Sequence, residues 1–237
     1  MASTPTRSAD PWHDTDVIDE RAPRFNQAIT GAVALAGVVF SWPLAWALMA
    51  AQLAIGLMLG RRFCLPCLAY FTIVQPRFGE GRLEDSRPPR FANMVGVAFL
   101  GSAAVAWWLG AELAGTILGS VVAALALLAA ATGFCIGCWA YRIAARWRGV
   151  SRVDRHERLD PADLVGLDAA ARAHVEFAHP LCAECGEWET RLAALPEPYL
   201  SVDVRKRPDL AHKYGIAVVP TVLAVSADGA VLERLAP

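Results

Sequence analysis

Two long apolar stretches dominate the first 145 residues. Residues 25–60 carry no Lys, Arg, Asp or Glu, and residues 91–141 carry only one such side chain, Glu112. About 20 apolar residues are enough for a helix to cross the hydrocarbon core of a bilayer. Both stretches exceed that length, so the pattern predicts a membrane-embedded first half.

Each apolar stretch is long enough for two helices. As one helix, residues 28–59 would extend about 48 Å, against about 30 Å for the hydrocarbon core. Proline interrupts helices, so a break is expected at Ser41-Trp42-Pro43. The second stretch divides at Gly110-Ala111-Glu112, which gives spans near 92–109 and 116–137. Four transmembrane helices are predicted, with a re-entrant hairpin as the alternative for the short arms of the first stretch.

Basic residues are confined to alternate connections of these spans. Positive charge gathers at the cytoplasmic side of membrane proteins, so an even number of spans places both termini in the cytoplasm. Residues 1–24 are polar and lack the apolar core of a secretory signal, which predicts a multi-pass protein retained in a bacterial-type cell membrane. The arginines before the first span, between the second and third, and after the fourth are Arg21, Arg24, Arg61, Arg62, Arg77, Arg82, Arg87, Arg90, Arg142, Arg146 and Arg148.

The second half differs in composition and is expected to fold as a separate domain. Residues 1–149 carry a formal charge of +3 and residues 150–237 a charge of −4. The whole chain is 55% hydrophobic and 19% charged, with a net charge of −1, which excludes a disordered chain and a basic nucleic-acid binder. The predicted organisation is a polar N-terminal segment 1–24, a four-span domain 25–145, a charged linker 146–160 and a domain 161–237.

Alternating strand and helix patterns predict an α/β domain at residues 161–237. Asp160-Pro161 supplies the N-cap acid and first-turn proline of a helix that should run to about Ala173. Asp228-Gly229 is a hairpin signal between the last two strands. The order is a βαβ unit followed by an antiparallel hairpin. The other predicted elements are strand 175–178, helix 182–195, strand 199–204, helix 208–214, and strands 221–225 and 231–235.

All six cysteines fall in three Cys-X-X-Cys pairs. The first pair is Cys64/Cys67, the second Cys135/Cys138 and the third Cys182/Cys185. The first two pairs end the second and fourth spans, so the topology places all three pairs at the cytoplasmic side. Two thiols at this spacing can form a disulfide, and four thiolates can ligate zinc or copper. The first and second pairs are therefore candidates for a redox relay or a metal site, and no metal is assigned elsewhere.

The first half resembles a known bacterial membrane family. Residues 17–27 (VIDERAPRFNQ) and 87–93 (RPPRFAN), together with the first two pairs, resemble the domain of unknown function 4395. The resemblance covers about residues 15–145 and implies a four-span membrane domain without established chemistry. The arginines beside Pro23 and Pro88-Pro89 are expected to contact membrane lipid. Residues 76–90 show no recognisable site.

The last third of the chain is similar to thioredoxin. Cys182-Ala183-Glu184-Cys185 directly follows the first predicted strand, and Val219-Pro220-Thr221 directly precedes the third. The resemblance covers about residues 173–236 and implies a thioredoxin-like domain that lacks the closing C-terminal helix. One face of the sheet would then be covered by the helix near 161–173, by the membrane domain or by a second copy in a homo-oligomer.

The thioredoxin resemblance also implies roles for four residues. Cys182 would be the nucleophile and Cys185 the resolving thiol, beside a cis-proline at Pro220 and a buried carboxylate at Glu176. A helix N-terminus stabilises the thiolate that attacks a substrate disulfide, and a thiol one turn later can resolve the mixed disulfide. The backbone of Val219 is expected to offer strand-like hydrogen bonds to an extended substrate.

Two departures from thioredoxin affect these expectations. Leu181 replaces the tryptophan before the first cysteine, and Ala183-Glu184 replaces the Gly-Pro between the cysteines. A carboxylate there disfavours a neighbouring thiolate, which predicts a more reducing pair than an oxidase would have. His174, His179 and His212 fall at no ligand spacing with the cysteines and are expected at the surface or in turns.

Three functions are compatible with the sequence. The first is a membrane-tethered thiol–disulfide oxidoreductase that carries out dithiol exchange through Cys182 and Cys185. Its substrate would be a protein or small-molecule disulfide, and no cofactor would be required. The cysteine pairs of the membrane domain would relay electrons to or from this pair. The second is a zinc- or copper-binding membrane protein with a thioredoxin-like accessory module. The third is a non-catalytic binding module on a membrane anchor.

Overall fold

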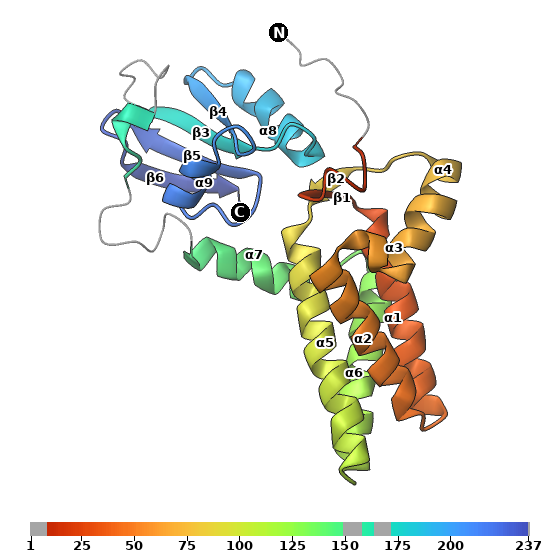
Figure 1. Cartoon of the computed structure of the whole chain (residues 1–237). Helices are drawn as coiled ribbons and strands as arrows, with labels where there is room; N and C mark the ends of the chain where they lie inside the picture. Colours follow the sequence, from red (N-terminus) through yellow and green to blue (C-terminus); the bar gives the residue numbers. More distant parts are fainter. Residues whose placement is uncertain (1–8, 149–157, 164–171, 237) are drawn as a thin grey trace. The chain divides into compact units, whose positions relative to one another are not determined.

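The computed structural model describes residues 9–148, 158–163 and 172–236 (Figure 1). Contacts divide the chain into two compact units. The helical unit comprises Asp10–Gly81 and Pro88–Tyr141, and the sheet unit comprises Arg82–Arg87 and Arg142–Pro237 together with Met1–Ala9. Each unit has its own hydrophobic core.

Four long helices form the body of the helical unit (Figure 1). They are α1 (Arg21–Val39), α2 (Pro43–Leu59), α5 (Arg87–Trp108) and α6 (Glu112–Thr132). Both predicted breaks are confirmed. Pro43 is the first residue of α2, where its missing N–H costs no helical hydrogen bond. Gly110, with φ of 86°, adopts the conformation that glycine tolerates best in the turn between α5 and α6.

Shorter elements connect the long helices. A 3-10 turn at Arg61–Phe63 leads into α3 (Leu65–Ala69), a π-helical turn (Tyr70–Val74) and α4 (Gln75–Phe78). Two three-residue strands, β1 (Val17–Asp19) and β2 (Leu83–Asp85), precede α1 and α5. Helix α7 (Ile136–Arg148) follows α6.

The fourth predicted span ends earlier than expected. Helix α6 stops at Thr132 because Gly133 adopts a left-handed conformation, with φ of 77°, and its N–H bonds the carbonyl of Ala129 at 2.8 Å. The prediction that Cys135 and Cys138 end this span is therefore wrong. They lie at the start of α7 instead.

Helices α5 and α6 are each long and apolar enough to cross a membrane. In the described part of the chain, α2 is also apolar but shorter, with 17 residues. Many large apolar side chains of α5 and α6 are exposed, a surface typical of contact with lipid or another apolar partner. They include Val95, Phe99, Val105, Trp108, Leu113, Ile117, Val121, Leu125 and Leu128. These features suggest membrane association.

A buried tryptophan marks the core of the helical unit. The indole Nε1 of Trp46 in α2 donates a 3.0 Å hydrogen bond to the carbonyl of Ala34 in α1. Gly37 and Gly119 lie so close to this ring that a Cβ on either would fall within 3 Å of it. Small residues on α1 and α6 therefore allow the four helices to pack around Trp46.

A four-stranded sheet with the order β4-β3-β5-β6 forms the centre of the sheet unit (Figure 1). Strand β3 pairs in parallel with β4 and antiparallel with β5, which pairs antiparallel with β6. The predicted order of elements is confirmed. The strands are β3 (Arg172–Ala178), β4 (Tyr199–Asp203), β5 (Thr221–Ser226) and β6 (Val231–Ala236), and the helices are α8 (Ala183–Ala193) and α9 (Pro208–Lys213).

A helix packs against each face of this sheet. On one face, Leu192 of α8 packs with Val222 of β5. On the other, Leu223 and Phe177 belong to the core that contains Tyr214, the residue after α9, and the rings of Phe177 and Tyr214 are 6.0 Å apart. Alternation along β5 thus sends successive side chains to opposite cores.

The helix predicted from Pro161 to Ala173 is only partly described, and its end is wrong. Pro161–Asp163 forms a single 3-10 turn, and residues 164–171 lie outside the described residues. Arg172 and Ala173 belong to β3, where they pair with β5. The strong pairing of a central strand overrides the local helical preference of these two residues.

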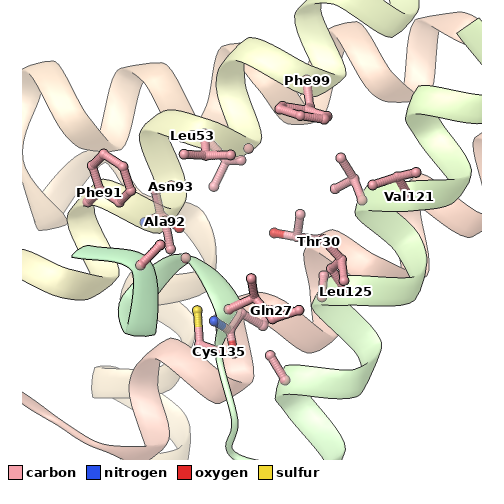
Figure 2. A pocket seen from close by; sticks show the side chains of 18 residues that line it. Gln27, Thr30, Leu53, Phe91, Ala92, Asn93, Phe99, Val121, Leu125 and Cys135 are labelled. Atoms are coloured by element: carbon pink, nitrogen blue, oxygen red, sulfur yellow. The ribbon is translucent and has the colours of Figure 1, made fainter. Parts of the chain in front are cut away.

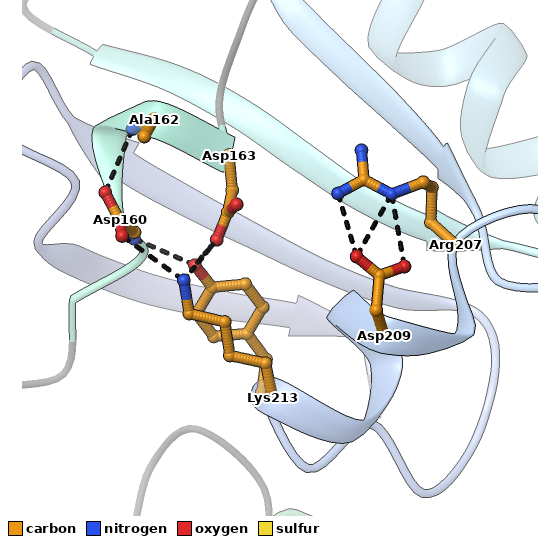
Figure 3. A network of polar contacts seen from close by, with 7 residues as sticks. Asp160, Ala162, Asp163, Arg207, Asp209 and Lys213 are labelled. Carbon is orange, nitrogen blue, oxygen red and sulfur yellow. Dashed lines mark hydrogen bonds and ion pairs between the residues drawn. The ribbon is translucent and has the colours of Figure 1, made fainter.

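Charged and polar side chains fix this 3-10 turn beside α9 (Figure 3). Lys213 Nζ lies 2.6 Å from Asp163 Oδ2 and 3.2 Å from Asp160 Oδ2. The hydroxyl of Tyr214 donates to Asp163 and accepts from the backbone N–H of Asp160. Nearby, Arg207 and Asp209 form a separate two-residue ion pair. The network anchors the chain that enters the sheet unit to the end of α9.

Candidate functional site

All three Cys-X-X-Cys pairs adopt the same local geometry. In each, the sulfur of the first cysteine accepts a 3.3 Å hydrogen bond from the backbone N–H of the second. Each pair stands at the start of a helix: α3 begins after Cys64, α7 after Cys135 and α8 after Cys182. N–H groups at a helix start have no intrahelical partner, so the first sulfur of each pair receives one of them.

The three pairs differ in whether their sulfur atoms are bonded to each other. Cys64 and Cys67 form a disulfide with Cα atoms 5.2 Å apart, whereas the four cysteines of the second and third pairs are free thiols. That separation lies within the usual range for disulfides. One chain therefore contains one disulfide and two dithiols, and all three pairs have the same local hydrogen-bond geometry.

The third pair lies at the junction of β3 and α8. Cys182 is the N-cap residue of α8 and Cys185 lies in its first turn. Both side chains are buried, with 6% and 3% of their surface exposed. The peptide bond between Val219 and Pro220, directly before β5, is cis. The structure thus places the predicted cysteines at a helix start that follows the strand carrying Glu176.

Glu176 is a fully buried carboxyl group in the middle of β3. Within the described residues, neither of its carboxyl oxygens has a hydrogen-bond partner. Burial, reinforced by the negative charge of Glu189, raises its pKa from 4.5 to about 8. At neutral pH the group is therefore mostly protonated, and it can exchange a proton near pH 8.

The thiol of Cys185 is held in its protonated form. Its hydrogen bond with the Cys182 side chain is the main cause that raises the pKa of Cys185, and burial adds to it. The charge of an ionised Glu176 also raises this pKa, so the two groups are electrostatically coupled. Cys185 must therefore lose its proton to a nearby base before it can act as a nucleophile.

One residue of this site was missed by the sequence analysis. Asp85, in the segment that showed no recognisable site, accepts a 3.1 Å hydrogen bond from the backbone N–H of Val219. Its carboxyl group is almost fully buried, and this burial raises its pKa. The N–H that was expected to face a substrate is thus taken by the chain itself. Such a long-range contact leaves no signal in the sequence.

Two arginines extend this contact. Arg87 Nη1 donates a 3.2 Å hydrogen bond to the carbonyl of Ile216, and Arg82 forms a 2.7 Å ion pair with Glu187 of α8. Strand β2 also contacts α8 directly. Residues 82–87 therefore lie against both the start of α8 and the loop before the cis peptide.

Two histidines are more buried than expected. His174 and His179 each expose 3% of their surface, whereas His212 is exposed as predicted. His179 lies in the turn before Cys182, where its Nδ1 accepts from the N–H of Leu181 at 3.2 Å and its carbonyl accepts from the N–H of Cys182 at 3.0 Å. It shapes the turn that leads to the third pair.

The second pair borders a cavity in the helical unit (Figure 2). The cavity has a volume of about 420 Å³, is open at the protein surface, and is lined by residues of α1, α2, α5, α6 and the start of α7. Most of its lining is apolar, and Cys135, Gln27, Thr30 and Asn93 are the lining residues with polar or thiol side chains. The structure therefore places one candidate cysteine on the wall of a site large enough for a small molecule.

The surroundings of Cys135 make its thiol acidic. It lies three residues beyond the end of α6 and is partly exposed. A hydrogen bond from the side chain of Cys138 is the main cause that lowers the pKa of Cys135 to about 6, and the side chain of Gln27 contributes as well. Cys135 is thus largely a thiolate at neutral pH, the reactive form of the group.

In the part of the chain that the structure describes, the first and second pairs are not arranged as a set of metal ligands. Among the residues that the structure describes, no group of three or more His, Cys, Asp or Glu side chains is arranged to hold a metal ion. Cys64 and Cys67 are joined as a disulfide, which supplies no thiolate ligands. Zinc or copper binding by all four cysteines would require reduction of this disulfide and rearrangement of the pairs, and it stays a prediction.

Comparison with known proteins identifies the first half of the chain. Residues 18–146 match the model of a family described as Domain of unknown function (DUF4395). The chain belongs to this family. The match confirms the family resemblance expected for about residues 15–145. No curated protein and no solved structure matches the chain.

The buried carboxyl of Glu176 predicts a pH-dependent stability. Between about pH 4.5 and 8 this group is protonated in the folded state and ionised in the unfolded state, so rising pH destabilises the fold. Glu176→Gln removes this ionisation. The variant should gain stability relative to the wild type as the pH rises from 5 to 8, by up to about 4 kcal/mol. Thermal unfolding of the full chain at both pH values measures this gain. Glu233→Gln, at an exposed carboxylate of β6, serves as the control. An equal difference at pH 5 and pH 8 would contradict the assignment.

Proposed function

We propose that this DUF4395 protein is a membrane-tethered thiol–disulfide oxidoreductase. A four-span domain would anchor a thioredoxin-like domain that exchanges dithiols through Cys182 and Cys185. The observation that carries the proposal is the arrangement of this pair at the start of α8, directly after β3, with a buried carboxyl on that strand and a cis peptide before β5. It is the arrangement that the thioredoxin resemblance implies.

The proposed reaction transfers two electrons to a substrate disulfide. The thiolate of Cys182 attacks one substrate sulfur, so that a mixed disulfide forms and the other sulfur leaves as a thiolate. Cys185 gives its proton to the carboxylate of Glu176 and attacks the sulfur of Cys182. The substrate sulfur that was bonded to Cys182 then leaves as a thiolate, and Cys182 and Cys185 become joined as a disulfide. The reverse sequence would oxidise a dithiol, and neither direction requires a cofactor.

The raised pKa of Glu176 fits a role in the second step. A base accepts a proton most effectively when its pKa lies near that of the working solution. Burial brings the pKa of Glu176 to about 8 and couples it to Cys185. In its ionised form the carboxylate has no hydrogen-bond partner within the described residues, so this form can take up the proton of the thiol.

The membrane arrangement is the second part of the proposal. Helices α5 and α6 meet the length and hydropathy criteria of spans, and α1 and α2 would form the other hairpin. The exposed apolar side chains would contact lipid, and the arginines would face the cytoplasm of a bacterial-type cell. This topology places the three cysteine pairs in one compartment, where a relay between them becomes feasible. A homo-oligomer stays a prediction.

The nucleophile assignment is testable by trapping. Cys185→Ser removes the resolving thiol, so a mixed disulfide should accumulate on Cys182 because nothing releases it. Non-reducing electrophoresis and mass spectrometry of the full chain, isolated from cells after acid quenching, measure the adduct. Cys182→Ser/Cys185→Ser is the matched control and should trap nothing. Absence of an adduct on Cys182 in the single variant would refute the assignment and favour a passive binding module.

The contact of Asp85 with Val219 predicts restricted access to the third pair. Asp85→Ala removes the acceptor for the Val219 N–H and frees it for an extended substrate. Reduction of a peptide disulfide should become about three- to tenfold faster, the range expected for loss of one competing hydrogen bond. Asp85→Asn retains an acceptor oxygen and should change the rate less. Equal rates for wild type and Asp85→Ala would show that residues 82–87 do not compete with substrate.

The sidedness of the thiols tests the proposed topology. In intact cells, a membrane-impermeant maleimide should not label Cys135 or Cys182, whereas permeabilised cells should be labelled after mild reduction. A cysteine placed at Ala111, in the turn between α5 and α6, should react from outside because that turn faces the opposite side. Labelling of Cys182 in intact cells would overturn the arrangement in which all pairs share the cytoplasm.

A further inference from the structure

The cavity beside Cys135 has the composition of a site for a lipid-soluble molecule. Its walls are formed by α1, α2, α5 and α6, and apolar residues such as Leu53, Phe99 and Leu125 make up most of them. Two of these helices, α5 and α6, are long and apolar enough to cross a membrane. A volume of about 420 Å³ lies in the range of pockets that bind small molecules, and it can hold one ring and part of an attached alkyl tail. An extended peptide, with its many polar backbone groups, would not be solvated there.

Three side chains with hydrogen-bonding groups line this cavity. Thr30 is 94% buried, and within the described residues its hydroxyl has no hydrogen-bond partner. The side chains of Gln27 and Asn93 also line the cavity (Figure 2). The carbonyl oxygen of Asn93 accepts from Asn26 at 3.2 Å, which leaves its amide N–H₂ group outside that bond. A hydroxyl and two amides can all donate to a ligand oxygen, and a buried donor without a partner is costly unless a ligand satisfies it.

One cysteine of the second pair lines the same cavity. The sulfur of Cys135 lines the cavity and accepts from the N–H of Cys138. Neither cysteine is disulfide-bonded, so the pair can give up two electrons and two protons as it closes to a disulfide. The lowered pKa of Cys135 supports its role as the attacking sulfur. The occupant should therefore be a two-electron acceptor that dissolves in lipid and carries oxygens able to accept hydrogen bonds.

We propose that this cavity binds the head group of a quinone and that the Cys135/Cys138 pair reduces it. A quinone combines an apolar ring and tail with two carbonyl oxygens, which matches the apolar walls and the donors of Thr30, Gln27 and Asn93. This site is separate from the proposed exchange at Cys182, and it extends the proposed function to a membrane-soluble electron carrier.

The reaction balances with the groups named. The thiolate of Cys135 adds to a ring carbon of the quinone, one ring oxygen takes up a proton, and a sulfur–carbon bond forms. The sulfur of Cys138, after losing its proton, attacks the sulfur of Cys135. A disulfide forms, the sulfur–carbon bond breaks, and its electron pair remains on the ring. With a second proton the ring leaves as a hydroquinone, so two thiols and one quinone become one disulfide and one hydroquinone.

Oxidation of this one pair by a short-chain ubiquinone tests the proposal. The full chain in lipid nanodiscs is reduced with a dithiol reagent, freed of the reagent and mixed with the quinone. Differential alkylation and peptide mass spectrometry then follow the disulfide between Cys135 and Cys138 separately from the other pairs. One hydroquinone should appear for each disulfide formed there.

Two variants and two controls make the result specific. Leu125→Trp fills the cavity and should abolish oxidation by the quinone, whereas Leu128→Trp, on an exposed leucine of α6 outside the lining, should not. Thr30→Val removes only the hydroxyl and should slow the reaction by about three- to tenfold. A water-soluble disulfide oxidant, such as oxidised glutathione, should oxidise the pair at similar rates in all these variants.

The outcomes separate this proposal from the proposed function. Equal quinone rates in wild type and Leu125→Trp would overturn the quinone site, as would oxidation of the pair without hydroquinone formation. The trapping of a mixed disulfide on Cys182 does not depend on this cavity. A failed quinone reaction with successful trapping would thus reject the site alone, and the opposite result would reject only the exchange at Cys182.

Discussion

The contact between a cysteine sulfur and a backbone N–H three residues later underlies each candidate site of this protein. The Cys-X-X-Cys spacing leaves the second cysteine in the first helical turn, where its N–H has no intrahelical acceptor. The sulfur of the first cysteine fills that position at 3.3 Å in all three pairs. What differs is the surrounding structure: a short helix for Cys64, an apolar cavity for Cys135 and the end of a central strand for Cys182. The same local motif thus acquires different chemistry from its environment.

Burial without a partner is the second theme of the structure. Glu176 and Thr30 are polar side chains placed in apolar surroundings, and the described residues offer them no hydrogen bond. Such groups lower stability, so they persist where another role compensates for the loss. Each shares its unit with a dithiol: Glu176 influences Cys185 electrostatically, and Thr30 lines the same cavity as Cys135. This pairing of an unsatisfied polar group with a dithiol supports both proposals.

The sequence predicts local features well and long-range contacts poorly. The breaks at Pro43 and Gly110 follow from backbone chemistry, and the order of strands and helices after Arg172 follows from periodicity and turn residues. The end of α6 was missed because the left-handed cap at Gly133 competes with a continuing apolar pattern. Asp85 was missed for a different reason. Its partner, the N–H of Val219, is 134 residues away, and a backbone donor has no side-chain identity to recognise.

The disulfide between Cys64 and Cys67 closes a very small ring, since only two residues separate the cysteines. A crosslink stabilises a fold mainly by restricting the unfolded chain, and this restriction grows with the length of the enclosed segment. A four-residue loop accounts for about 2 kcal/mol, against about 4.7 kcal/mol for a loop of 100 residues. Reduction of this bond would therefore destabilise the helical unit less than reduction of a disulfide that closes a long loop. Such a crosslink contributes less to the architecture than one that joins distant parts of the chain.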